Sequence, residues 1–534
     1  MRKSIVLFFT ALLTLCISAK PAYRGPIVRT AEDGSEKLVY LHGNEHFHYM
    51  TDAVGHWLDE ATLVPMSEAQ KALRLQAREA AQANRAPQRQ TAGDEPNLAP
   101  RGLLILVNFK DIQFSTPTDT IDSMLNGANF TRHYTYNYYT GTGTRRTKTI
   151  KSKGSARQYF RDQSYGAYNP VFDVVGPVTL SHDESYYGSN TSQYYTDTRA
   201  YLMVKEACEK ADNLGVNFKL YDNDNDGVVD FIYLIYAGYG EADGGGENTI
   251  WPHSSDMTYY SYKHDGKYLG RYACGNEISM TTNQYDGIGT VCHEFSHVLG
   301  LPDFYCTSDS DDPPHTLVDW DLMDYGCYNN AGNTPPAYSA YERFYMGWIT
   351  PRVLVEPEYV NLPNLNEGEG EALILSSTDT HNMIGWNPQP TNFFLLETRD
   401  KKGWDEFLPG KGMLITRIRY NRTKWQYNTV NNTPGTMGVD ILEAKTNTGG
   451  LGRSTDAFPA GATQWTELEG HEITEITRSN DGIVHFSFRG APNPEGIEEV
   501  SDQQSVVSGQ KILQNGQLII IRNGQQYDII GNRL

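Results

Sequence analysis

Apolar residues fall into short blocks along this chain, and their spacing within each block predicts secondary structure. Continuous apolar runs at 103–109 and 231–236 have the length of buried strands. Between them, apolar residues recur at helical spacing over 195–212, which predicts a helix. Because strands alternate with helices, residues 98–350 are expected to form an α/β domain. The same patterns predict a helix from Ser155, strands at 171–178 and 271–280, and a Tyr- and Thr-rich loop after Phe109.

A smaller unit precedes this domain. Residues 37–41 alternate like a strand, and Ser67 opens a helix with a capping box. The unit, residues 20–97, ends in a Pro- and Gln-rich linker, which predicts an α+β propeptide that is removed by cleavage. It contains no cysteine, so a thiolate cannot mask a metal site. His46 or His48 could do so, although histidines in a strand are more often plain surface or core residues.

The pattern changes again after the α/β domain. Short apolar runs such as 393–397 and 413–417 are separated by Gly, Pro and Asn, and few helical patterns remain. Residues 351–490 are therefore expected to form an all-β sandwich domain. Residues 491–534 begin as a linker and continue as three short strands joined by two Asn-Gly hairpin turns. The predicted fold class is thus a multidomain α+β protein.

Length and charge narrow the class of protein. A chain of 534 residues is too long for one core and should hold roughly two or three domains. Its 39% hydrophobic and 21% charged residues are ordinary for a soluble globular protein. The formal charge of −20 argues against a nucleic-acid partner, because phosphate binding needs a basic surface.

The first residues have the form of an export signal. A basic start precedes an apolar run over 5–16, which is followed by small residues. That run is too short to span a bilayer, and no later segment is long enough. We therefore expect a signal peptide over 1–19 and a secreted protein. Cys16 raises the alternative of a lipoprotein, but the residue before it, Leu15, is not small.

Five cysteines remain after the signal peptide. An odd number leaves at least one thiol free in an exported protein. A Cys292–Cys327 or a Cys274–Cys306 bridge is compatible with the spacing, and the sequence does not decide the pairing.

One short motif carries the chemistry. On a helix, His293 and His297 lie on one face, where both imidazoles can bind a zinc ion. Glu294 then lies beside the metal and can take a proton from a bound water. Gly300 can end the helix in a left-handed cap, so that the chain turns back and brings Asp303 within reach as a third ligand. Three protein ligands and one open position are typical of a catalytic zinc site, and the reaction implied is amide hydrolysis.

A second metal site is predicted in an acidic loop. Carboxylates alternate around Gly227 as in the first nine positions of an EF-hand loop, which wraps oxygen ligands around calcium. The twelfth position is Tyr233 rather than the bidentate glutamate of an EF-hand, so only the loop is EF-like. We expect a structural calcium ion, with a solvated acidic turn as the alternative. The expected ligands are Asp222, Asp224, Asp226 and Asp230.

The segment 320–326, Trp-Asp-Leu-Met-Asp-Tyr-Gly, resembles a Met-turn, in which a thioether lies beneath the zinc ligands. Its methionine, Met323, follows the expected third ligand, Asp303, by some twenty residues. Tyr325 stands where several metzincins carry a tyrosine that stabilises the oxyanion, and we predict that catalytic role for it.

Together these motifs resemble the immune inhibitor A-like secreted zinc metallopeptidases, a metzincin-like family. The likeness spans residues 98–490 and implies that His293 and His297 are zinc ligands and that Glu294 is the catalytic base. The tail, 511–533, is similar to sorting segments of type IX secretion substrates in Gram-negative bacteria. The motifs that carry the family likeness are His293–Tyr305, Trp320–Gly326, Trp251–His253, Phe394–Glu397 and Gly403–Gly412.

The third zinc ligand departs from the family pattern. Most metzincins end the signature with histidine, and this chain has Asp303 in that place. Aspartate binds zinc well, so we favour Asp303. The alternative is Glu342, a downstream glutamate on a helix, as in thermolysin-like enzymes.

The sequence therefore predicts a secreted zinc endopeptidase, made as a zymogen, that hydrolyses protein or peptide substrates. We expect it outside the cell or on the outer surface of a Gram-negative bacterium. The tail would engage the secretion machinery, and the β domain could contact host or cell-surface proteins. The rival hypothesis is a non-catalytic surface adhesin with a degenerate protease domain, and a secreted zinc hydrolase other than a peptidase is a smaller alternative. The intact Glu294 argues against the adhesin, because a binding module needs no carboxylate there.

Overall fold

The structure is a computed structural model of the chain and describes most of its 534 residues. Residues 1–17, which hold Cys16 and most of the predicted signal peptide, lie outside the described part, as do residues 85–93 of the predicted linker. The described residues are 18–84, 94–190, 197–308, 314–368, 370–446, 450–494, 498–499, 511–514, 517–522, 525–529 and 533–534.

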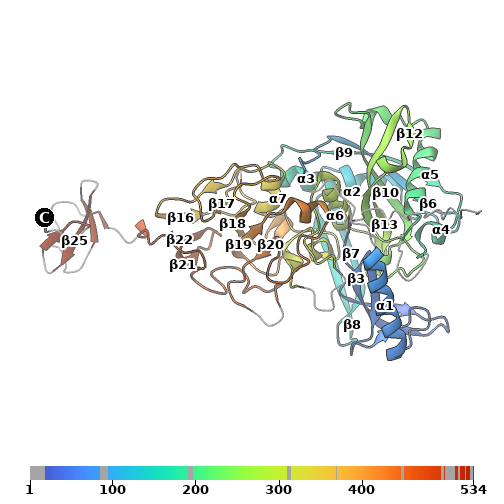
Figure 1. Cartoon of the computed structure of the whole chain (residues 1–534), viewed down its shortest axis with the longest axis horizontal. Coiled ribbons are helices and arrows are strands. Elements are labelled where there is room, and N and C mark those ends of the chain that lie inside the picture. The colour runs from blue at the N-terminus through green and yellow to red at the C-terminus, as the bar shows by residue number, and fades with distance from the viewer. Residues whose placement is uncertain are drawn as a thin grey trace, which may run out of the picture.

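A mixed β-sheet forms the centre of the α/β domain (Figure 1). Four parallel strands in the spatial order β13-β10-β6-β9 make its middle, and β11 and then β1 extend it antiparallel at one edge. The apolar runs at 103–109 and 231–236 are buried strands, as predicted. The strands are β1 (Ser18–Ala19), β6 (Arg101–Asn108), β9 (Val171–Thr179), β10 (Val228–Tyr239), β11 (His253–Asp256), β12 (Lys263–His264), β13 (Lys267–Ser279) and β14 (Gln284–Tyr285).

Successive residues of the central strands point to opposite faces and build two cores. Leu104 and Leu106 of β6 belong to the core that includes α2, α3 and α6, whereas Leu103 and Ile105 belong to the core that includes α5. Because both faces are covered, these strands are apolar throughout. The helices are α2 (Thr118–Asn126), α3 (Ala156–Gln163), α4 (Glu184–Gly188), α5 (Ala200–Asn213), α6 (Ile288–Leu299) and α7 (Ala340–Tyr345).

The segment after Phe109 differs from the predicted loop. It forms α2 and then an antiparallel ribbon in which β7 (Thr131–Tyr139) pairs with β8 (Arg145–Lys153). In β7, Tyr134, Tyr136 and Tyr138 alternate with polar residues, but most side chains of the ribbon are exposed or half-buried, and β8 has a single apolar residue, Ile150. Its threonines and tyrosines, which favour strands, were the remaining signal.

An N-terminal unit packs against the α/β domain. Gln70 Oε1 accepts a hydrogen bond from the backbone nitrogen of Ser67 at 2.9 Å, and Ser67 Oγ accepts one from the backbone nitrogen of Gln70 at 3.3 Å, which is the predicted capping box. The apolar core of the unit includes Ala242 and Trp251 of the α/β domain, so burial holds the two together. The unit consists of the antiparallel sheet β2 (Pro26–Thr30), β3 (Glu36–Asn44), β4 (Phe47–Thr51) and β5 (Trp57–Leu58), and of α1 (Glu68–Asn84).

The region after residue 350 consists largely of two sheets that share an apolar core, as expected for a sandwich. A second core runs on from the α/β domain and joins Phe295 of α6 to Phe393 and Leu395 of β18. One sheet has the order β15-β17-β18-β19-β20 and the other β16-β22-β21. The elements are β15 (Arg352–Val353), β16 (Glu358–Leu362), β17 (Leu373–Leu375), β18 (Asn392–Arg399), β19 (Gly412–Arg419), α8 (Arg422–Gln426), β20 (Val439–Ile441), β21 (Ile473–Arg478) and β22 (Val484–Phe488).

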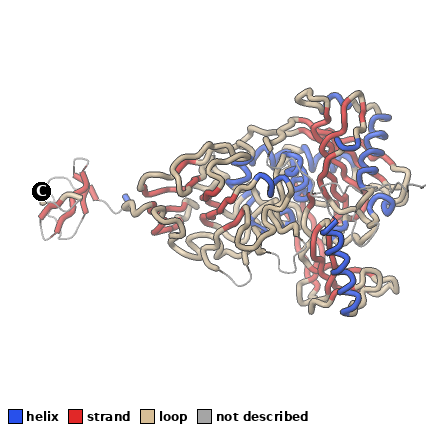
Figure 2. Tube along the Cα trace, viewed as in Figure 1, coloured by secondary structure: helices blue, strands red, loops and turns tan. Residues whose placement is uncertain are grey.

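The C-terminal tail forms a small sheet that stands apart from the body of the molecule (Figure 2). Its strands β24, β25 and β26 pair antiparallel in sequence order, in agreement with the predicted hairpins. The Asn-Gly residues of the two turns, 515–516 and 523–524, lie outside the described residues. The strands are β23 (Glu498–Glu499), β24 (Lys511–Gln514), β25 (Gln517–Arg522) and β26 (Gln525–Tyr527).

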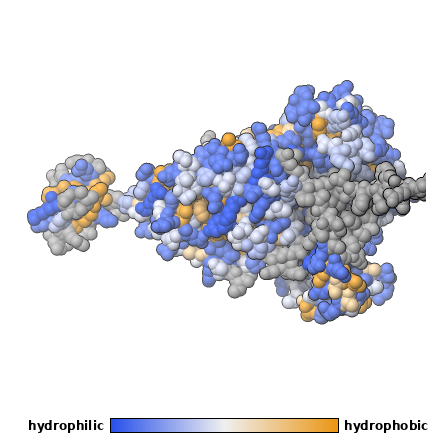
Figure 3. Space-filling model, viewed as in Figure 1, coloured by the Kyte–Doolittle hydropathy of each residue, from blue (hydrophilic) through white to orange (hydrophobic). Residues whose placement is uncertain are grey.

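The visible surface of the body is mainly hydrophilic (Figure 3). Apolar residues gather on the N-terminal unit and on the C-terminal sheet (Figure 3). Val54, Val64 and Leu73 are large apolar side chains that the N-terminal unit exposes. Among the described helices, none is both long enough and apolar enough to cross a bilayer.

The five cysteines of the described residues are free thiols. The bridges considered from the sequence, Cys292–Cys327 and Cys274–Cys306, are therefore wrong. Burial raises the pKa of Cys274, Cys292 and Cys327, so these thiols behave as small core residues rather than as ligands or nucleophiles.

Candidate metal centre

Helix α6 holds the histidine motif in the interior of the molecule. All of its residues are buried, and the apolar ones join the core between the sheet and the region after residue 350. The helix ends at Gly300, whose φ of 115° lies in the left-handed region that favours glycine. Its backbone nitrogen donates to the carbonyl oxygens of Ser296 and His297, which closes the helix where the sequence predicts. The chain then turns back toward the two histidines.

Three side chains converge beyond this turn. His293 Nε2 and His297 Nε2 lie 3.2 Å apart, and Asp303 Oδ1 lies 3.2 Å from the first and 3.1 Å from the second. Ligand atoms of a tetrahedral zinc site with bonds of about 2 Å lie about 3.3 Å apart. The three donors therefore have the mutual spacing that such an ion requires. Their atoms are of the types that zinc prefers, two imidazole nitrogens and one carboxylate oxygen.

Backbone carbonyls orient both imidazole rings. Nδ1 of His293 contacts the carbonyl oxygen of Leu322 at 2.8 Å, and Nδ1 of His297 contacts that of Leu301 at 2.8 Å. A carbonyl can only accept, so each Nδ1 carries a proton and each Nε2 faces Asp303. The segment 320–326 thus supports the site as a Met-turn would, with the side chain of Met323 fully buried.

The Asp303 carboxylate is held by a residue that sequence patterns did not indicate. Asn428 Nδ2 donates to Asp303 Oδ2 at 2.5 Å, and Asn428 Oδ1 accepts from the backbone nitrogen of Asp303 at 2.7 Å. Asn428 follows α8 in the β-rich region, 125 positions away in sequence. This double contact leaves Asp303 Oδ1 directed at the rings.

The alternative ligand, Glu342, caps the start of helix α7 instead of facing the two histidines. Its Oε2 accepts hydrogen bonds from the backbone nitrogen of Ser339 at 2.6 Å and from Ser339 Oγ at 3.0 Å, which completes a capping box at the start of α7. The geometry therefore favours Asp303 as the third ligand.

Charge at the site also suits a cation. Burial lowers the pKa of His293. Burial acts the same way on His297, but the Asp303 carboxylate outweighs it and raises the pKa of His297 to about 9. Burial opposes ionisation of Asp303, yet the histidines outweigh it and lower its pKa, so the carboxylate stays charged. Binding of a divalent ion would release a proton from His297.

Glu294 lies next to the three donors and faces a peptide group. Its Oε1 accepts a hydrogen bond from the backbone nitrogen of Lys20 at 2.8 Å. Its Oε2 has no hydrogen-bond partner among the described residues. Burial raises the pKa of Glu294 to about 8, which suits a group that exchanges a proton near neutral pH.

The peptide group belongs to residues 18–24, which we call the strap. The strap enters the cleft as β1, the outermost strand of the central sheet. Tyr305 Oη donates to the carbonyl oxygen of Ala19 at 2.5 Å, and Tyr328 Oη donates to that of Pro21 at 2.7 Å. The indole nitrogen of Trp251 donates to the carbonyl oxygen of Lys20 at 2.9 Å. Every carbonyl from residue 19 to residue 21 is thus bound in the cleft.

Tyr305, and not the predicted Tyr325, donates to a carbonyl beside the site. The guanidinium of Arg24 lies over the Tyr325 ring, 3.3 Å from its centroid. Tyr325 therefore contacts the end of the strap, and its catalytic role stays a prediction. Tyr305 follows Asp303 by two positions, so its closeness to the site could have been inferred from the motif, but its direction could not.

The acidic loop brings together three of the four predicted calcium ligands. Asp222, Asp224 and Asp226 place carboxylate oxygens within 4.8 Å of one another. Asp230 is outside this group, and its Oδ2 accepts from the backbone nitrogen of Asn223 at 2.6 Å. The Lys267 ammonium also pairs with Asp222 and supplies part of the charge that a cation would supply.

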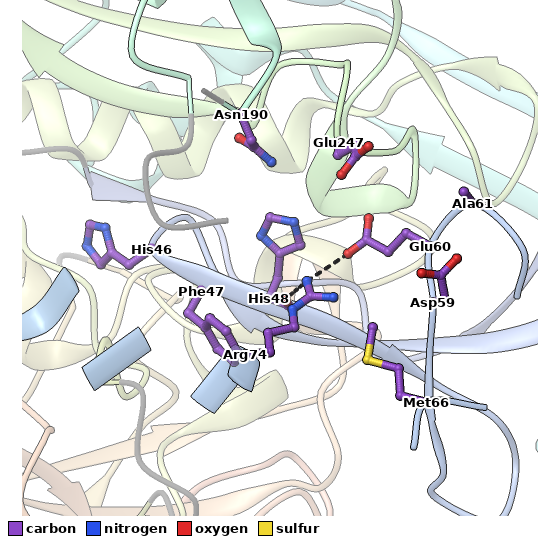
Figure 4. Close-up of a pocket in the computed structure, with 10 residues that line it drawn as sticks. All are labelled: His46, Phe47, His48, Asp59, Glu60, Ala61, Met66, Arg74, Asn190 and Glu247. Atoms are coloured by element: carbon purple, nitrogen blue, oxygen red, sulfur yellow. Dashed lines mark hydrogen bonds and ion pairs between the residues drawn. The ribbon is translucent and has the colours of Figure 1, made fainter. Parts of the chain in front are cut away.

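The two histidines that could have masked the metal from the N-terminal unit, His46 and His48, pair with other residues. His46 Nε2 pairs with Glu45 Oε1 at 2.9 Å, and His48 Nε2 pairs with Glu241 Oε1 of the α/β domain at 3.0 Å. Both border a cavity of about 310 Å³ between the unit and the domain (Figure 4). In the same cavity wall, Arg74 pairs with Glu60 (Figure 4). This space is an interface between two parts of the chain, whereas the strap fills the cleft at the metal centre.

Comparison with known proteins places this site in a family. Residues 90–349, a little under half of the chain, match the family described as Immune inhibitor A peptidase M6, catalytic domain. Similar proteins include the pre-pro-metalloprotease PrtV of Vibrio cholerae serotype O1, 28% identical over 220 residues, and Immune inhibitor A of Bacillus thuringiensis subsp. alesti, 26% identical over 257 residues.

These alignments are partial. The first covers 36% of this chain and 23% of PrtV, and the second covers 42% of this chain and 36% of Immune inhibitor A. The chain thus matches well under half the length of each of these relatives. The family match contains α6, the Asp303 turn and the 320–326 segment, which are the motifs that carry the resemblance. Residues 90–349 are therefore similar to the catalytic domain of the peptidase M6 (immune inhibitor A) family.

Proposed function

We propose that this protein is a secreted zinc endopeptidase that is made as a zymogen. The observation that carries the proposal is the convergence of His293, His297 and Asp303 beside a buried glutamate that faces a peptide nitrogen. The family match and the printed name of PrtV, a metalloprotease, support the same reaction class. A binding module has no need for this arrangement, which weighs against the adhesin hypothesis.

The proposed chemistry divides among a few side chains. A zinc ion held by His293, His297 and Asp303 would polarise the scissile carbonyl and acidify a water molecule. Glu294 takes the proton of that water and passes it to the leaving nitrogen. The hydrogen bond from the Lys20 nitrogen to Glu294 Oε1 supports the second transfer, because it puts an amide nitrogen within 2.8 Å of the carboxylate.

Tyr305 is the candidate for binding the carbonyl oxygen. A donor aimed at that oxygen stabilises the negative charge that develops on it during attack. The hydroxyl of Tyr305 already donates to the carbonyl of Ala19, which belongs to the same peptide bond as the Lys20 nitrogen. Glu294 therefore contacts the nitrogen and Tyr305 the carbonyl oxygen of one peptide group.

Latency would follow from the position of the strap. Residues 20 and 21, which remain after removal of the signal peptide, occupy the cleft with their carbonyls bound, so a substrate strand cannot enter until the strap leaves. Glu45 of the N-terminal unit is also buried beside the site, where its Oε2 accepts from Tyr305 Oη at 3.1 Å. Removal of the N-terminal unit would release both.

The remaining assignments complete the proposal. The loop of Asp222, Asp224 and Asp226 would bind a structural calcium ion. The signal peptide would end after residue 19, the propeptide and its linker would extend to residue 97, and the catalytic and β domains would meet at residues 350–351. The tail from residue 491 would direct secretion of the type IX kind to the outer surface of a Gram-negative cell. The β domain would contact host or cell-surface proteins.

Substitution of the base tests the enzymatic proposal. Glu294→Gln should keep the fold and the zinc content and lower peptide hydrolysis by a factor on the order of 10²–10⁴, because proton transfer is lost. The measurement is cleavage of casein together with metal analysis and circular dichroism. Glu209→Gln, at an exposed position of α5, is the matched control.

Chelation separates the enzyme from the adhesin. Loss of casein cleavage on removal of metal, with recovery on addition of zinc, is the expected result. Full turnover by Glu294→Gln would show that Glu294 is not the catalytic base. A wild-type protein that binds zinc but cleaves no polypeptide would favour the adhesin or a zinc hydrolase of another kind.

A further inference from the structure

The strap places a lysine side chain in a closed pocket beside the metal centre. Lys20 is only 1% exposed. Its Nζ lies 2.9 Å from Asp243 Oδ1 and 3.1 Å from Thr290 Oγ1, and it stands 5.1 Å from the centre of the Tyr328 ring. A lysine is rarely buried in this way unless its charge is matched.

The pocket holds a second carboxylate. Asp286 Oδ2 accepts from Thr290 Oγ1 at 2.7 Å, so Thr290 joins the ammonium to this carboxylate. Asp243 is 2% exposed and lies near Asn276, whose Nδ2 is 3.5 Å from Asp243 Oδ2. One ammonium therefore faces two carboxylates. When Lys20 leaves, a neutral or acidic side chain in its place would leave buried negative charge uncompensated.

The position of Lys20 relative to the reacting groups fixes which substrate residue the pocket receives. Its backbone nitrogen donates to Glu294 Oε1, and the carbonyl of the preceding residue accepts from Tyr305. The nitrogen that Glu294 protonates is the one that leaves. A residue bound like Lys20 is therefore the first residue on the leaving-amine side of the bond.

We propose that Asp243, Asp286 and Thr290 form the subsite for the residue that follows the scissile bond, and that this subsite selects a basic side chain. The proposal rests on the proposed peptidase function and adds a substrate class to it, polypeptides cleaved on the amino side of lysine. The strap, in this account, occupies the cleft with the residue type that the enzyme prefers.

The depth of the pocket favours lysine over arginine. The cavity that Asp286, Thr290 and Asn276 help to line measures about 10 Å³. That is about the room needed for one water molecule. A guanidinium is wider than an ammonium and would have to displace its surroundings, so arginine should be accepted less well than lysine.

A peptide series tests the selectivity. The enzyme is the zinc-loaded protein recovered from the medium of cells that express the full chain, after cleavage in the linker and removal of the N-terminal unit. The substrates are fluorescence-quenched peptides that differ only in the residue after the cleaved bond: Lys, Arg, Gln, Leu or Glu. We expect kcat/KM to be highest for Lys, lower for Arg, about 10–100-fold lower for Gln and Leu, and lowest for Glu. Equal turnover of the Lys and Gln peptides would overturn the proposal.

Substitutions assign the selectivity to the pocket. Asp243→Asn and Asp286→Asn should each reduce the ratio of Lys to Gln turnover while zinc content is kept. Asp173→Asn removes a carboxylate of β9 that pairs with Arg101 of β6. This control should leave the ratio unchanged. An unchanged ratio in both pocket variants would place the selectivity elsewhere and contradict the assignment.

A second measurement does not depend on catalysis. In the full chain, Lys20→Met keeps the length of the side chain and removes its charge. Hydrogen exchange of residues 18–24 should become faster in Lys20→Met, become faster to a smaller extent in Lys20→Arg, and stay the same in the control Lys71→Met on α1. Equal protection in the Lys20→Met chain would show that the pocket does not select charge.

The peptidase function and the lysine subsite can be disproved separately. A zinc-loaded protein that cleaves none of the peptides contradicts the peptidase function, and the exchange experiment then still decides whether the pocket selects a cation. A protein that cleaves the peptides without preference for a basic residue keeps the function and loses the subsite.

Discussion

At the scale of single residues, the candidate metal centre contains some side chains that sequence patterns predict and others that they do not predict. His293, His297 and Glu294 are fixed by helical spacing, because residues one turn apart share a face. Tyr305 differs, since its hydroxyl direction depends on the turn after α6 and on the strap. Its position two residues after Asp303 indicates closeness to the site, but no sequence signal gives the direction of its hydroxyl.

The tyrosine assignment leads to a first prediction. Tyr305→Phe should lower kcat of the zinc-loaded enzyme by a factor on the order of 10², because one donor to the developing oxyanion is lost. KM should change little, since the charge develops after binding. The measurement is steady-state kinetics on a single peptide.

Tyr325→Phe is the matched control for that prediction. Its ring lies under Arg24 of the strap, so the change should affect release of the strap rather than kcat. The reverse result, a loss of kcat in Tyr325→Phe and none in Tyr305→Phe, would restore the role that the sequence predicted for Tyr325.

At the scale of elements, short segments from separate strands and turns hold the N-terminal unit against the α/β domain. Strand β4 brings His48 to Glu241 in the turn after β10, and β3 and β2 bury apolar residues against Trp251. Burial lowers the pKa of His48, but the Glu241 carboxylate outweighs burial and raises it above 6.5. Burial also raises the pKa of Glu241. The docked state therefore binds more protons than the separated parts.

A pH dependence follows from these shifts. A histidine with a raised pKa stabilises docking fully below its ordinary value of about 6.5, and the stabilisation is lost as pH rises through the docked value. We expect the N-terminal unit of a linker-nicked zymogen to dissociate more readily as pH rises from about 6 to 8.5. Size-exclusion chromatography across this range measures the fraction that remains bound.

Two variants sharpen that experiment. His48→Gln should flatten the profile, whereas His56→Gln, an exposed histidine paired with Asp52 in the same unit, should not. Tighter docking at alkaline pH in the wild-type protein would contradict the assignment.

The acidic loop before β10 gives a prediction at the same scale. Calcium bound by Asp222, Asp224 and Asp226 should fix the start of that strand and raise Tm by about 5 °C at 100-fold excess over Kd. Magnesium, which demands a stricter octahedral geometry, should do less. Differential scanning calorimetry with the Asp224→Asn, Asp226→Asn double variant as control decides the point. An equal Tm with and without calcium would show that the loop binds no calcium ion, and that the ion pair with Lys267 is what balances its charge.

At the scale of the whole molecule, the metal centre is shared between regions that the sequence separates at residue 350. Asn428 holds Asp303 from the β-rich side. Arg399 of β18 donates to the carbonyl oxygen of Ala337 at 2.9 Å. The apolar core around α6 also continues into β18 and β19. The third ligand is thus ordered by contacts that the α/β domain alone does not contain.

Truncation tests this dependence. A chain that ends at residue 350 should fail to bind zinc and should aggregate, because the apolar residues around α6 lose their cover. A chain that ends at residue 494 lacks only the tail and should keep both zinc and activity. In the full chain, Asn428→Ala should weaken zinc binding by about 10–100-fold. A soluble chain of residues 1–350 that holds zinc would show that the α/β domain builds the site alone.

Local patterns predicted much of the fold. The buried strands β6 and β10, the capping box at Ser67 and the left-handed cap at Gly300 depend on a few adjacent residues, and each forms as expected. The ribbon β7–β8 was missed because its exposed faces carry little apolar alternation. The sequence left the disulfide pairing open, and neither of the two bridges considered forms in the structure.

The sequence by itself determined which atoms can bind a metal and move a proton, because a helix places residues at fixed angles whatever surrounds it. The tertiary structure alone decided which carboxylate lies between the two histidines, which tyrosine faces the carbonyl and which segment lies beside Glu294. These depend on chain segments hundreds of residues apart, such as Lys20 against Glu294 and Asn428 against Asp303. No local pattern encodes such contacts, because they exist only after the chain has closed around a common core.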